Sequence, residues 1–362
     1  MAPSLRVHSC SSKVFISPRL IIFGMPRRRK YPESVRRKAL WLYQHGLGYK
    51  RISKFLGVPK GTLRKWFLSY PLDIAVDETD IITITPFERG YLAGIIEGEG
   101  SLFLWTFLSN GKRKAKPAIS ICNTDPDIIS RCQDIIQKLT GYRPKPRIIK
   151  RKNRRQLFRL NVRHLTYVLL VLQAIRPYLA GRKRIICELL LDLIKRNRTP
   201  PPEEEIVKLA QYVKKVNNSD EIYSATEPIP PFLFSDKLCW EIPSHDLGYL
   251  VAMVEGEGSI YLEQKQDCWF AIIKLSNTDV MVVRKICSIL RTVGCPYHVK
   301  VRVKNRKRPC HDIFITRLHI IHSFISFLLP FLVGRKKQIA KLMLRFCQRR
   351  LEKKSYDRED YE

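Results

Sequence analysis

Two glutamates, Glu99 and Glu257, stand at the ends of two apolar segments with nearly the same nine residues. The segments span 92–100 and 250–258, and each closes with Glu-Gly-Glu-Gly. Both have the composition of a buried helix that stops at glycine. Two such helices packed side by side would bring two carboxylates to one place. Carboxylate and carbonyl oxygens suit Mg²⁺ or Mn²⁺, and such a site is typical of metal-assisted phosphodiester cleavage.

The charge of the chain indicates the kind of molecule that it binds. Among 362 residues, 66 are Lys or Arg and 33 are Asp or Glu, which gives a formal net charge of +33. Such a field attracts phosphate backbones. An anionic membrane surface is the alternative partner for this charge. As a separate point, no apolar run reaches the ~20 residues that span a bilayer. The ten cysteines include no C-x-x-C pair, which indicates free thiols in a reducing compartment and no zinc site.

Three landmarks recur in the same order along the chain. Glu99 and Glu257 are 158 residues apart, the two Asn-Thr-Asp tripeptides (123–125 and 277–279) are 154 apart, and the two Gly-Arg-Lys tripeptides (181–183 and 334–336) are 153 apart. Changes in loop length explain the small drift. The sequence therefore predicts two related repeats.

Each repeat has the pattern of helix, two strands, helix, two strands and two helices, so the predicted class is α+β. We expect repeat 1 at 86–198, a linker at 199–244 with a short helix near 203–216, and repeat 2 at 245–354. The first motif helix is predicted over 88–97. The predicted strands are 101–107, 118–122, 147–151, 156–162, 259–263, 270–275, 298–303 and 312–316. A basic turn is expected at 110–114.

The segment 25–70 has its own composition, with thirteen Lys or Arg and one acid, Glu33. Its pattern predicts three short helices, which begin near Pro32, Tyr49 and Pro59. Two helices joined at a Gly-containing turn, with a basic third element, resemble a helix-turn-helix. The residues that would then face DNA are Lys60, Thr62, Arg64 and Lys65. The alternative is a basic three-helix bundle with no contact in a DNA groove.

Residues 1–24 contain no acid and show no clear period. We interpret them as a disordered arm, an organellar transit peptide or the product of a start codon placed upstream of the true one, since Met25 opens the helical segment. The compartment stays open between the cytoplasm or nucleoid and an organelle.

The paired motif resembles that of the LAGLIDADG homing endonucleases of the single-chain, two-repeat kind, over about 86–354. The resemblance implies that Glu99 and Glu257, at the eighth motif position, are the metal ligands and that Gly98 and Gly256 supply carbonyl oxygens. The sixth-position acids, Glu97 and Glu255, are then mainly structural. Both acids of each motif are Glu where the family name has Asp, which keeps the type of ligand.

The family also places a basic side chain near each scissile phosphate. The candidates are Lys183 and Lys336, with Arg182 and Arg335 next to them; the alternative is contact with the DNA backbone or with nothing. Asp125 and Asp279 each precede a predicted helix, so we interpret them as N-caps and not as metal ligands.

The implied fold is a saddle of two four-stranded antiparallel sheets over the major groove, with the motif helices between them. The second hairpin of each repeat is strongly basic: residues 143–163 contain ten Lys or Arg and residues 297–308 contain six, without an acid. Strand alternation would direct one set toward the groove. The candidates are Arg147, Lys150, Arg154, Arg155, Arg159, Lys300, Arg302, Lys304, Arg306 and Lys307.

These features favour a monomeric, site-specific double-strand DNA endonuclease. The resemblance implies that a mobile intron encodes it. Two alternatives remain. A non-catalytic transcription regulator would use the helix-turn-helix and leave the acids without a role, and an intron maturase would bind structured RNA.

Overall fold

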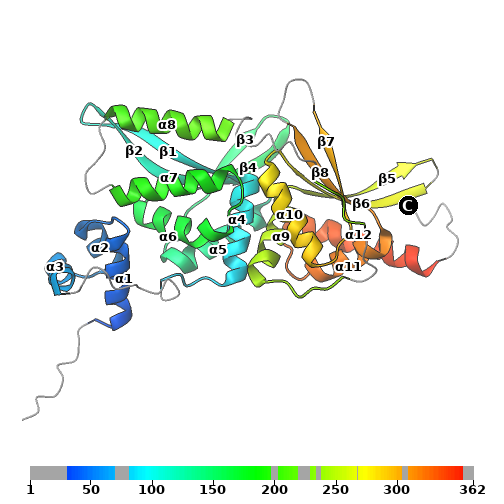
Figure 1. The fold of residues 1–362 in the computed structure, drawn as a ribbon, viewed down its shortest axis with the longest axis horizontal. Helices are drawn as coiled ribbons and strands as arrows, with labels where there is room; N and C mark the ends of the chain where they lie inside the picture. Colours follow the sequence, from blue (N-terminus) through cyan, green and yellow to red (C-terminus); the bar gives the residue numbers. More distant parts are fainter. Residues whose placement is uncertain are drawn as a thin grey trace, which may run out of the picture.

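The computed structural model describes residues 31–69, 81–196, 203–218, 229–233, 238–266, 268–303 and 309–353. The segment 1–24 and Met25 lie outside these ranges. The described part contains the predicted α+β fold, with three helices followed by two repeats (Figure 1). The domain limits given above stay predictions.

The three N-terminal helices are α1 (Glu33–Gln44), α2 (Tyr49–Leu56) and α3 (Lys60–Ser69). The left-handed Gly57, with a φ of 67°, ends α2, as glycine does at many helix ends. The buried side chains of Leu42, Ile52 and Leu63 form a small core. This unit packs against repeat 1, where the rings of Phe55 and Tyr167 lie 6.1 Å apart.

The two repeats have the same order of elements. Repeat 1 consists of α4 (Pro86–Glu99), β1 (Gly100–Ser109), β2 (Lys112–Asn123), α5 (Pro126–Thr140), β3 (Arg147–Arg151), β4 (Arg154–Val162), α6 (Leu165–Ile175), a 3₁₀ turn (Arg176–Tyr178) and α7 (Arg182–Arg196). Repeat 2 consists of α9 (Ser244–Gly256), β5 (Gly258–Lys265), β6 (Cys268–Asn277), α10 (Val280–Thr292), β7 (His298–Arg302), β8 (Cys310–Ile315), α11 (Leu318–Leu328) and α12 (Gly334–Glu352). The sheets are antiparallel with strand orders β1-β2-β4-β3 and β5-β6-β8-β7.

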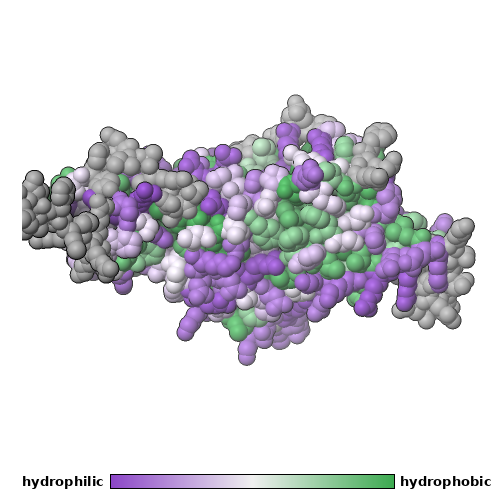
Figure 2. Space-filling view, turned by 90° about the horizontal axis from the view of Figure 1, so that it is seen from below, coloured by the Kyte–Doolittle hydropathy of each residue, from purple (hydrophilic) through white to green (hydrophobic). Residues whose placement is uncertain are grey.

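The motif helices stand at the centre of the molecule, between the two sheets (Figure 1). Both begin on the lower side in that view and end above, where the first strand of each repeat starts. The lower side carries a central patch of hydrophobic side chains (Figure 2). The ends of the motif helices therefore lie on the opposite side from this patch.

The predicted basic turn at 110–114 is wrong. Asn110 and Gly111 have φ values of 54° and 70°, and Ser109 pairs directly with Lys112. This is the geometry of a two-residue hairpin turn, in which Asn-Gly tolerates positive φ at both positions. The basic residues 112–114 consequently belong to strand β2.

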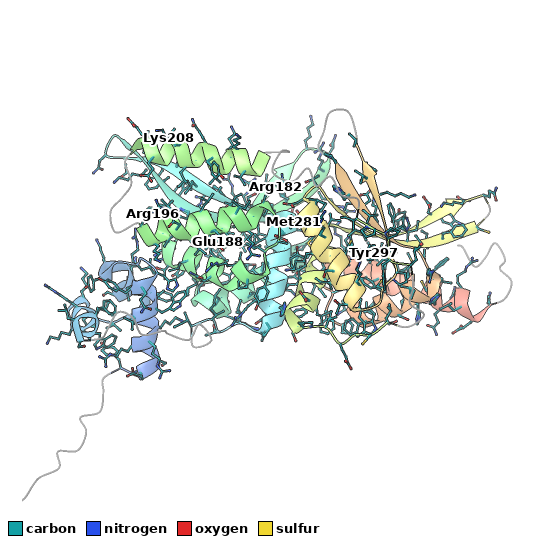
Figure 3. All side chains as sticks on the ribbon, in the orientation of Figure 1. Arg182, Glu188, Arg196, Lys208, Met281 and Tyr297 are labelled. Carbon is teal, nitrogen blue, oxygen red and sulfur yellow. The ribbon has the colours of Figure 1, made fainter. Side chains whose placement is uncertain are left out.

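The linker helix α8 (Glu203–Asn218) agrees with the predicted helix near 203–216. It packs on α7 and on the first hairpin of repeat 1 through the buried Val213 and Val216. Figure 3 labels Lys208 on α8 and Arg196 on α7. The linker thus contributes to the core of repeat 1. Among the described residues, no helix has the length and apolarity to cross a membrane.

Helix α4 begins two residues earlier and ends two residues later than predicted. Thr85 and Glu88 form a capping box at its start, which satisfies free backbone N–H groups. Glu99 is its last residue, and Glu257 caps the C-terminus of α9. The two glutamates therefore lie at the helix ends and not beyond them.

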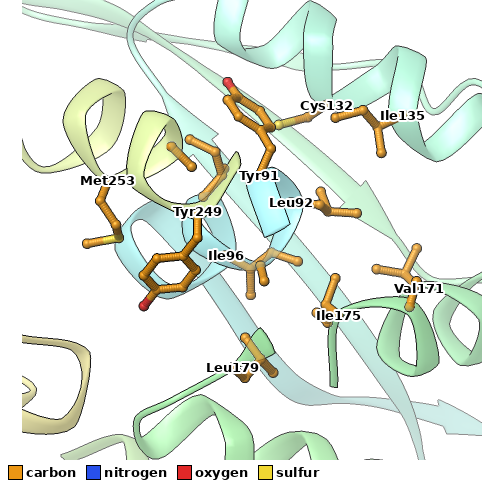
Figure 4. Packing of buried hydrophobic residues seen from close by; sticks show 14 of the residues in the cluster. Tyr91, Leu92, Ile96, Cys132, Ile135, Val171, Ile175, Leu179, Tyr249 and Met253 are labelled. Carbon is orange, nitrogen blue, oxygen red and sulfur yellow. The ribbon is translucent and has the colours of Figure 1, made fainter. Parts of the chain in front are cut away.

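Close packing of α4 on α9 fixes the two repeats against each other. A Cβ on Gly90 would lie 1.8 Å from the carbonyl oxygen of His245, and one on Gly94 would lie 2.7 Å from Cβ of Ala252. Small residues at these positions let the helix axes approach to the near end of the usual range. Tyr91, on α4, and Tyr249, on α9, lie fully buried at this junction (Figure 4).

Candidate active site

The structure brings the four predicted metal ligands together in a crosswise arrangement. A Cβ placed on Gly98 would lie 3.0 Å from Cγ and 3.3 Å from Oε1 of Glu257. On the other side, a Cβ on Gly256 would lie 3.3 Å from Cγ of Glu99. Each acid therefore lies against the glycine of the other repeat, which has no side chain to displace it.

The two carboxylates are held in conditions that disfavour their negative charge. Burial and, second, the nearby charge of Glu257 raise the pKa of Glu99 to about 7, although the charges of Lys183 and Lys336 act in the opposite direction. Burial also raises the pKa of Glu257. Two partly buried like charges repel each other, and a divalent cation between them would remove that repulsion.

The predicted lysines lie beside these acids. The ammonium group of Lys183 donates to the carbonyl oxygens of Ile96 (2.7 Å) and Glu97 (2.6 Å) at the end of α4. That of Lys336 donates to the carbonyl oxygen of Gly258. Burial lowers the pKa of Lys183 to about 8 and also lowers that of Lys336. Each lysine is thus a cation at the end of the motif helix of its own repeat.

The sixth-position acids are hydrogen-bonded to residues of both repeats. Glu97 accepts hydrogen bonds from the backbone N–H groups of Ala180 (2.6 Å) and Gly181 (3.0 Å) and from the hydroxyl of Tyr249. Both Glu97 and its counterpart Glu255 are buried. This agrees with the structural role that the resemblance implies.

Glu255 has the matching partners. It accepts hydrogen bonds from the hydroxyl of Tyr91 (2.5 Å) and from the backbone N–H of Val333 (2.6 Å). Sequence analysis missed the roles of Tyr91 and Tyr249. The signal was present, since Gly-Tyr directly precedes the motif in both copies.

Asn123 is a further polar neighbour that the sequence analysis missed. Its amide Nδ2 donates to Oε1 of Glu99 over 3.3 Å, and its Oδ1 accepts the backbone N–H of Asp125 over 2.8 Å. Asn123 therefore orients one of the two central carboxylates.

A pocket of about 660 Å³ adjoins the centre on the side of Glu257. Its walls include Gly98 and Lys183 from repeat 1, and Ser276 and Asp279 from repeat 2. Both repeats therefore contribute to a space beside one of the carboxylates. Among the described residues, no cluster of three or more His, Cys, Asp or Glu forms a metal site, so a cation here would depend on the two glutamates and on backbone oxygens.

In the second hairpin of repeat 1, all five predicted DNA-contacting residues are exposed: Arg147, Lys150, Arg154, Arg155 and Arg159. They do not share one face. Arg159 pairs with Arg147 on β3 and donates to Sγ of Cys122 over 3.3 Å. Lys150 is three residues from Arg147 on β3, so it lies on the other face of that strand.

In repeat 2, the exposed Lys300 is available on β7, but Arg302 is engaged with Asp312 on β8. Nη2 of Arg302 donates to Oδ1 of Asp312 over 3.0 Å. Asp312 is 1% exposed and was missed from the sequence. The other three candidates of this hairpin, Lys304, Arg306 and Lys307, lie outside the described residues.

The candidates of the N-terminal unit lie in the first half of α3. Lys60, Arg64 and Lys65 are exposed, and Thr62 is half-buried. Leu63 and Phe67 face the core of the unit. The exposed side of α3 therefore carries three cations.

No family model matches the sequence, and no curated protein matches it. Solved structures do match the fold. I-GzeII, a LAGLIDADG homing endonuclease in complex with its DNA target, is 15% identical, with 77% of this chain and 94% of that chain covered and a TM-score of 0.53. I-SmaMI, bound to uncleaved DNA target in the presence of calcium ions, is 16% identical, with 77% and 95% covered and a TM-score of 0.54.

I-LtrWI, a LAGLIDADG homing endonuclease bound to target DNA, is 15% identical, with 76% and 94% covered and a TM-score of 0.54. At this identity the likeness concerns the fold. The part of this chain that these structures cover, 76–77% of it, is similar in size to the two repeats with their sheets and central helices. The chain therefore has the two-repeat fold of the LAGLIDADG homing endonucleases.

Proposed function

We propose that this chain is a site-specific DNA endonuclease that hydrolyses one phosphodiester bond in each strand of a duplex with the help of Mg²⁺ or Mn²⁺. The observation that carries this proposal is the crosswise arrangement at the helix ends. Glu99 lies against Gly256, and Glu257 lies against Gly98. Two equivalent sets of hard oxygen ligands fit a reaction with two equivalent strands.

Each of the two sets of oxygen ligands at the helix ends fits a divalent cation. Glu99 with the carbonyl oxygen of Gly256, and Glu257 with that of Gly98, would hold it. When bound, the cation lowers the pKa of a water and neutralises the leaving oxygen. Asn123 fixes the direction of the Glu99 carboxylate.

The two lysines supply positive charge where a scissile phosphate would gain negative charge. Lys183 and Lys336 are held by carbonyl oxygens at the motif-helix ends. A fixed cation in a partly buried site stabilises developing charge more than one in water does. We assign them to this role in preference to Arg182 and Arg335, whose side chains bond to threonine hydroxyls of the opposite repeat.

Double-stranded DNA is the proposed substrate. The net charge of +33 and the exposed cations of the second hairpins support contacts with phosphates and with bases in the major groove. I-GzeII and I-SmaMI, which share the fold, were both crystallised with DNA targets. The proposed molecule is a monomer, because one chain supplies both halves of the site. The exposed cations of α3 are proposed to add a second DNA contact as a helix-turn-helix.

A cleavage assay tests this function. A target is first selected by binding from a randomised duplex library. In parallel, a second DNA is assayed in which the two sequences that flank the gene are joined directly, without the gene between them. We expect double-strand cleavage with Mg²⁺ or Mn²⁺ and none with EDTA. Glu99→Gln and Glu257→Gln are expected to lose at least ~100-fold in rate and to keep DNA affinity.

The matched control is Glu188→Gln, because Glu188 lies on α7 in an exposed ion pair with Arg176. If the unmodified protein binds the DNA but does not cleave it, the result would favour the alternative of a non-catalytic transcription regulator. Tighter binding of structured RNA than of DNA at the same salt concentration would favour the maturase.

A further inference from the structure

The Asn-Thr-Asp and Gly-Arg-Lys tripeptides recur in both repeats, and the proposed function uses only their Asn123 and their lysines. In the structure the two tripeptides meet, and they do so crosswise. The Asn-Thr-Asp of repeat 2 contacts the Gly-Arg of repeat 1, and the reverse contact also forms.

Asp279 of repeat 2 accepts hydrogen bonds from the first residues of two helices. Its Oδ1 accepts the backbone N–H of Met281 (3.1 Å) at the start of its own α10. Its Oδ2 accepts the backbone N–H (2.7 Å) and Nε (3.2 Å) of Arg182 at the start of α7 in repeat 1. Arg182 and Met281, labelled in Figure 3, mark these two helix starts. Asp279 is therefore the predicted N-cap of its own helix and also binds the start of a helix in the other repeat.

Asp125 of repeat 1 repeats the arrangement. Its Oδ1 accepts the backbone N–H of Asp127 (3.0 Å) in α5, and its Oδ2 accepts the backbone N–H of Arg335 (2.8 Å) in α12. The guanidinium of Arg335 also donates to the hydroxyl of Thr124 over 2.8 Å.

The glycines of the Gly-Arg-Lys tripeptides make this contact sterically possible. A Cβ on Gly181 would lie 2.2 Å from Oδ2 of Asp279, and one on Gly334 would lie 2.3 Å from Oδ2 of Asp125. Any larger residue would displace the carboxylate. The two tripeptides are thus complementary in shape across the pair of repeats.

The consequence concerns the lysines. Lys183 follows Arg182 directly, so the residue that Asp279 anchors is the neighbour of the proposed catalytic cation. Asp279 and Asp125 are 6% and 3% exposed, and a buried carboxylate that accepts two or more N–H bonds holds its partners in one geometry. A carboxylate at a helix N-terminus is also favoured by the helix dipole.

We propose that Asp279 and Asp125 are positioning residues. Each aspartate holds the start of a helix in the other repeat, and that helix start carries a lysine of the proposed active site. Cleavage of each DNA strand then depends on both repeats, even though each lysine belongs to one of them. This inference rests on the proposed function.

The test measures the two strand cuts separately. The full-length protein is mixed in excess with a target duplex that carries a different fluorophore on each strand, and single-turnover rate constants are recorded. Asp279→Asn keeps the size and the capping ability of the side chain but loses its charge. We expect it to slow one strand cut by ~10- to 100-fold, with DNA affinity within about twofold of wild type.

Asp125→Asn is expected to slow the other strand cut by a similar factor. Nicked DNA should therefore accumulate with opposite strand bias in the two variants. The control is Asp192→Asn, since Asp192 lies on α7 in an exposed ion pair with Arg196. Equal slowing of both strands, or no slowing, would overturn the proposal, because loss of overall structure has no strand preference.

A second measurement is independent of catalysis. Amide hydrogen exchange at residues 180–184 should rise in Asp279→Asn and stay at the wild-type level in Asp125→Asn. Gly181→Ala, which retains the carboxylate and displaces it, should give the same local increase if Asp279→Asn does not fold. Unchanged exchange in a folded variant would refute the anchoring. Wild-type protein that cuts no DNA would refute the proposed function, while the exchange data would still decide the anchoring.

Discussion

The second hairpins of the two repeats occupy equivalent places but differ in the charge of their paired side chains. In repeat 1, Arg159 on β4 pairs with Arg147 on β3, and both are exposed. In repeat 2, at the same offset of 153 residues, Asp312 on β8 pairs with Lys300 on β7. Asp312 is buried, accepts a hydrogen bond from Ser276 over 2.7 Å and binds Arg302. The position that holds the exposed Arg159 in repeat 1 thus holds a buried carboxylate in repeat 2, and the exposed Arg302 forms an ion pair with it.

The ends of the motif helices, in contrast, are nearly the same in both repeats. Each has a glutamate against the opposite glycine and a lysine bound to backbone carbonyl oxygens. If the proposed function is right, the contrast has a simple reason. Phosphodiester bonds are chemically alike in both strands, whereas the two halves of a DNA site differ in base sequence. The chemistry is therefore duplicated and the contact surface has diverged.

The largest expected effect tests the equivalence of the two helix ends. Lys183→Met and Lys336→Met should each reduce the rate of cleavage by ~100-fold, because each removes a cation that is proposed to lie beside a scissile phosphate. Single-turnover assays on doubly labelled DNA should show equal losses on opposite strands. A loss in one variant alone would show that the two halves of the site are not equivalent.

The next effect concerns the charge that the centre holds without metal. The pKa of Glu99 is raised from 4.5 to about 7, so the folded protein binds this proton more tightly than the unfolded chain does. Stability should then fall as pH rises through this window. Glu99→Gln removes the effect and should be more stable than wild type by about 1–2 kcal/mol at pH 8.

Denaturant unfolding of metal-free protein at pH 5 and pH 8 measures this difference. It should be small at pH 5, and added Mg²⁺ should stabilise wild type more than Glu99→Gln. Equal stability of the two proteins at both pH values would contradict the burial of this charge.

A smaller effect should separate the two hairpins. Arg159→Gln in repeat 1 should weaken DNA binding by ~5- to 10-fold and reduce the salt slope by about one, with no change in Tm. Arg302→Gln in repeat 2 should lower Tm, because hydrogen bonds from Arg302 and Ser276 outweigh burial and keep the pKa of Asp312 low.

The pH dependence of the Arg302→Gln variant gives its control. A depressed pKa contributes stability above the pKa of the unfolded carboxyl, and this contribution is lost as pH falls. The Tm difference from wild type should therefore be full near pH 7 and shrink below about pH 4. A pH-independent difference would indicate lost packing in place of a lost ion pair.

The smallest effect compares the N-terminal unit with the sheets. Substitution of Lys60, Arg64 and Lys65 by Gln should together lower DNA affinity by a few-fold and reduce the salt slope by up to about one. The single-turnover rate at saturating protein should not change. Electrophoretic binding assays at several salt concentrations measure this, and unchanged affinity would leave α3 without a DNA contact.

The sequence by itself predicted much of the fold, because local patterns carry that information. Alternation and turn residues located the eight strands, and the three N-terminal helices begin near their predicted starts. The turn at 110–114 failed because its basic residues were given more weight than Asn-Gly. Glu99 and Glu257 recur 158 residues apart and Lys183 and Lys336 recur 153 apart. This recurrence and the family resemblance singled them out as candidates, and their roles stay predictions.

What only the tertiary structure decided are the contacts between the repeats. Tyr91 with Glu255, Asp279 with Arg182 and Asp125 with Arg335 join residues 97 to 210 positions apart. Each residue also has an ordinary local role, as a core tyrosine or a helix cap. Its recurrence in both repeats marks it in the sequence but does not identify the distant partner. The pairing follows from the close packing of α4 on α9, which places each repeat at the other's helix starts.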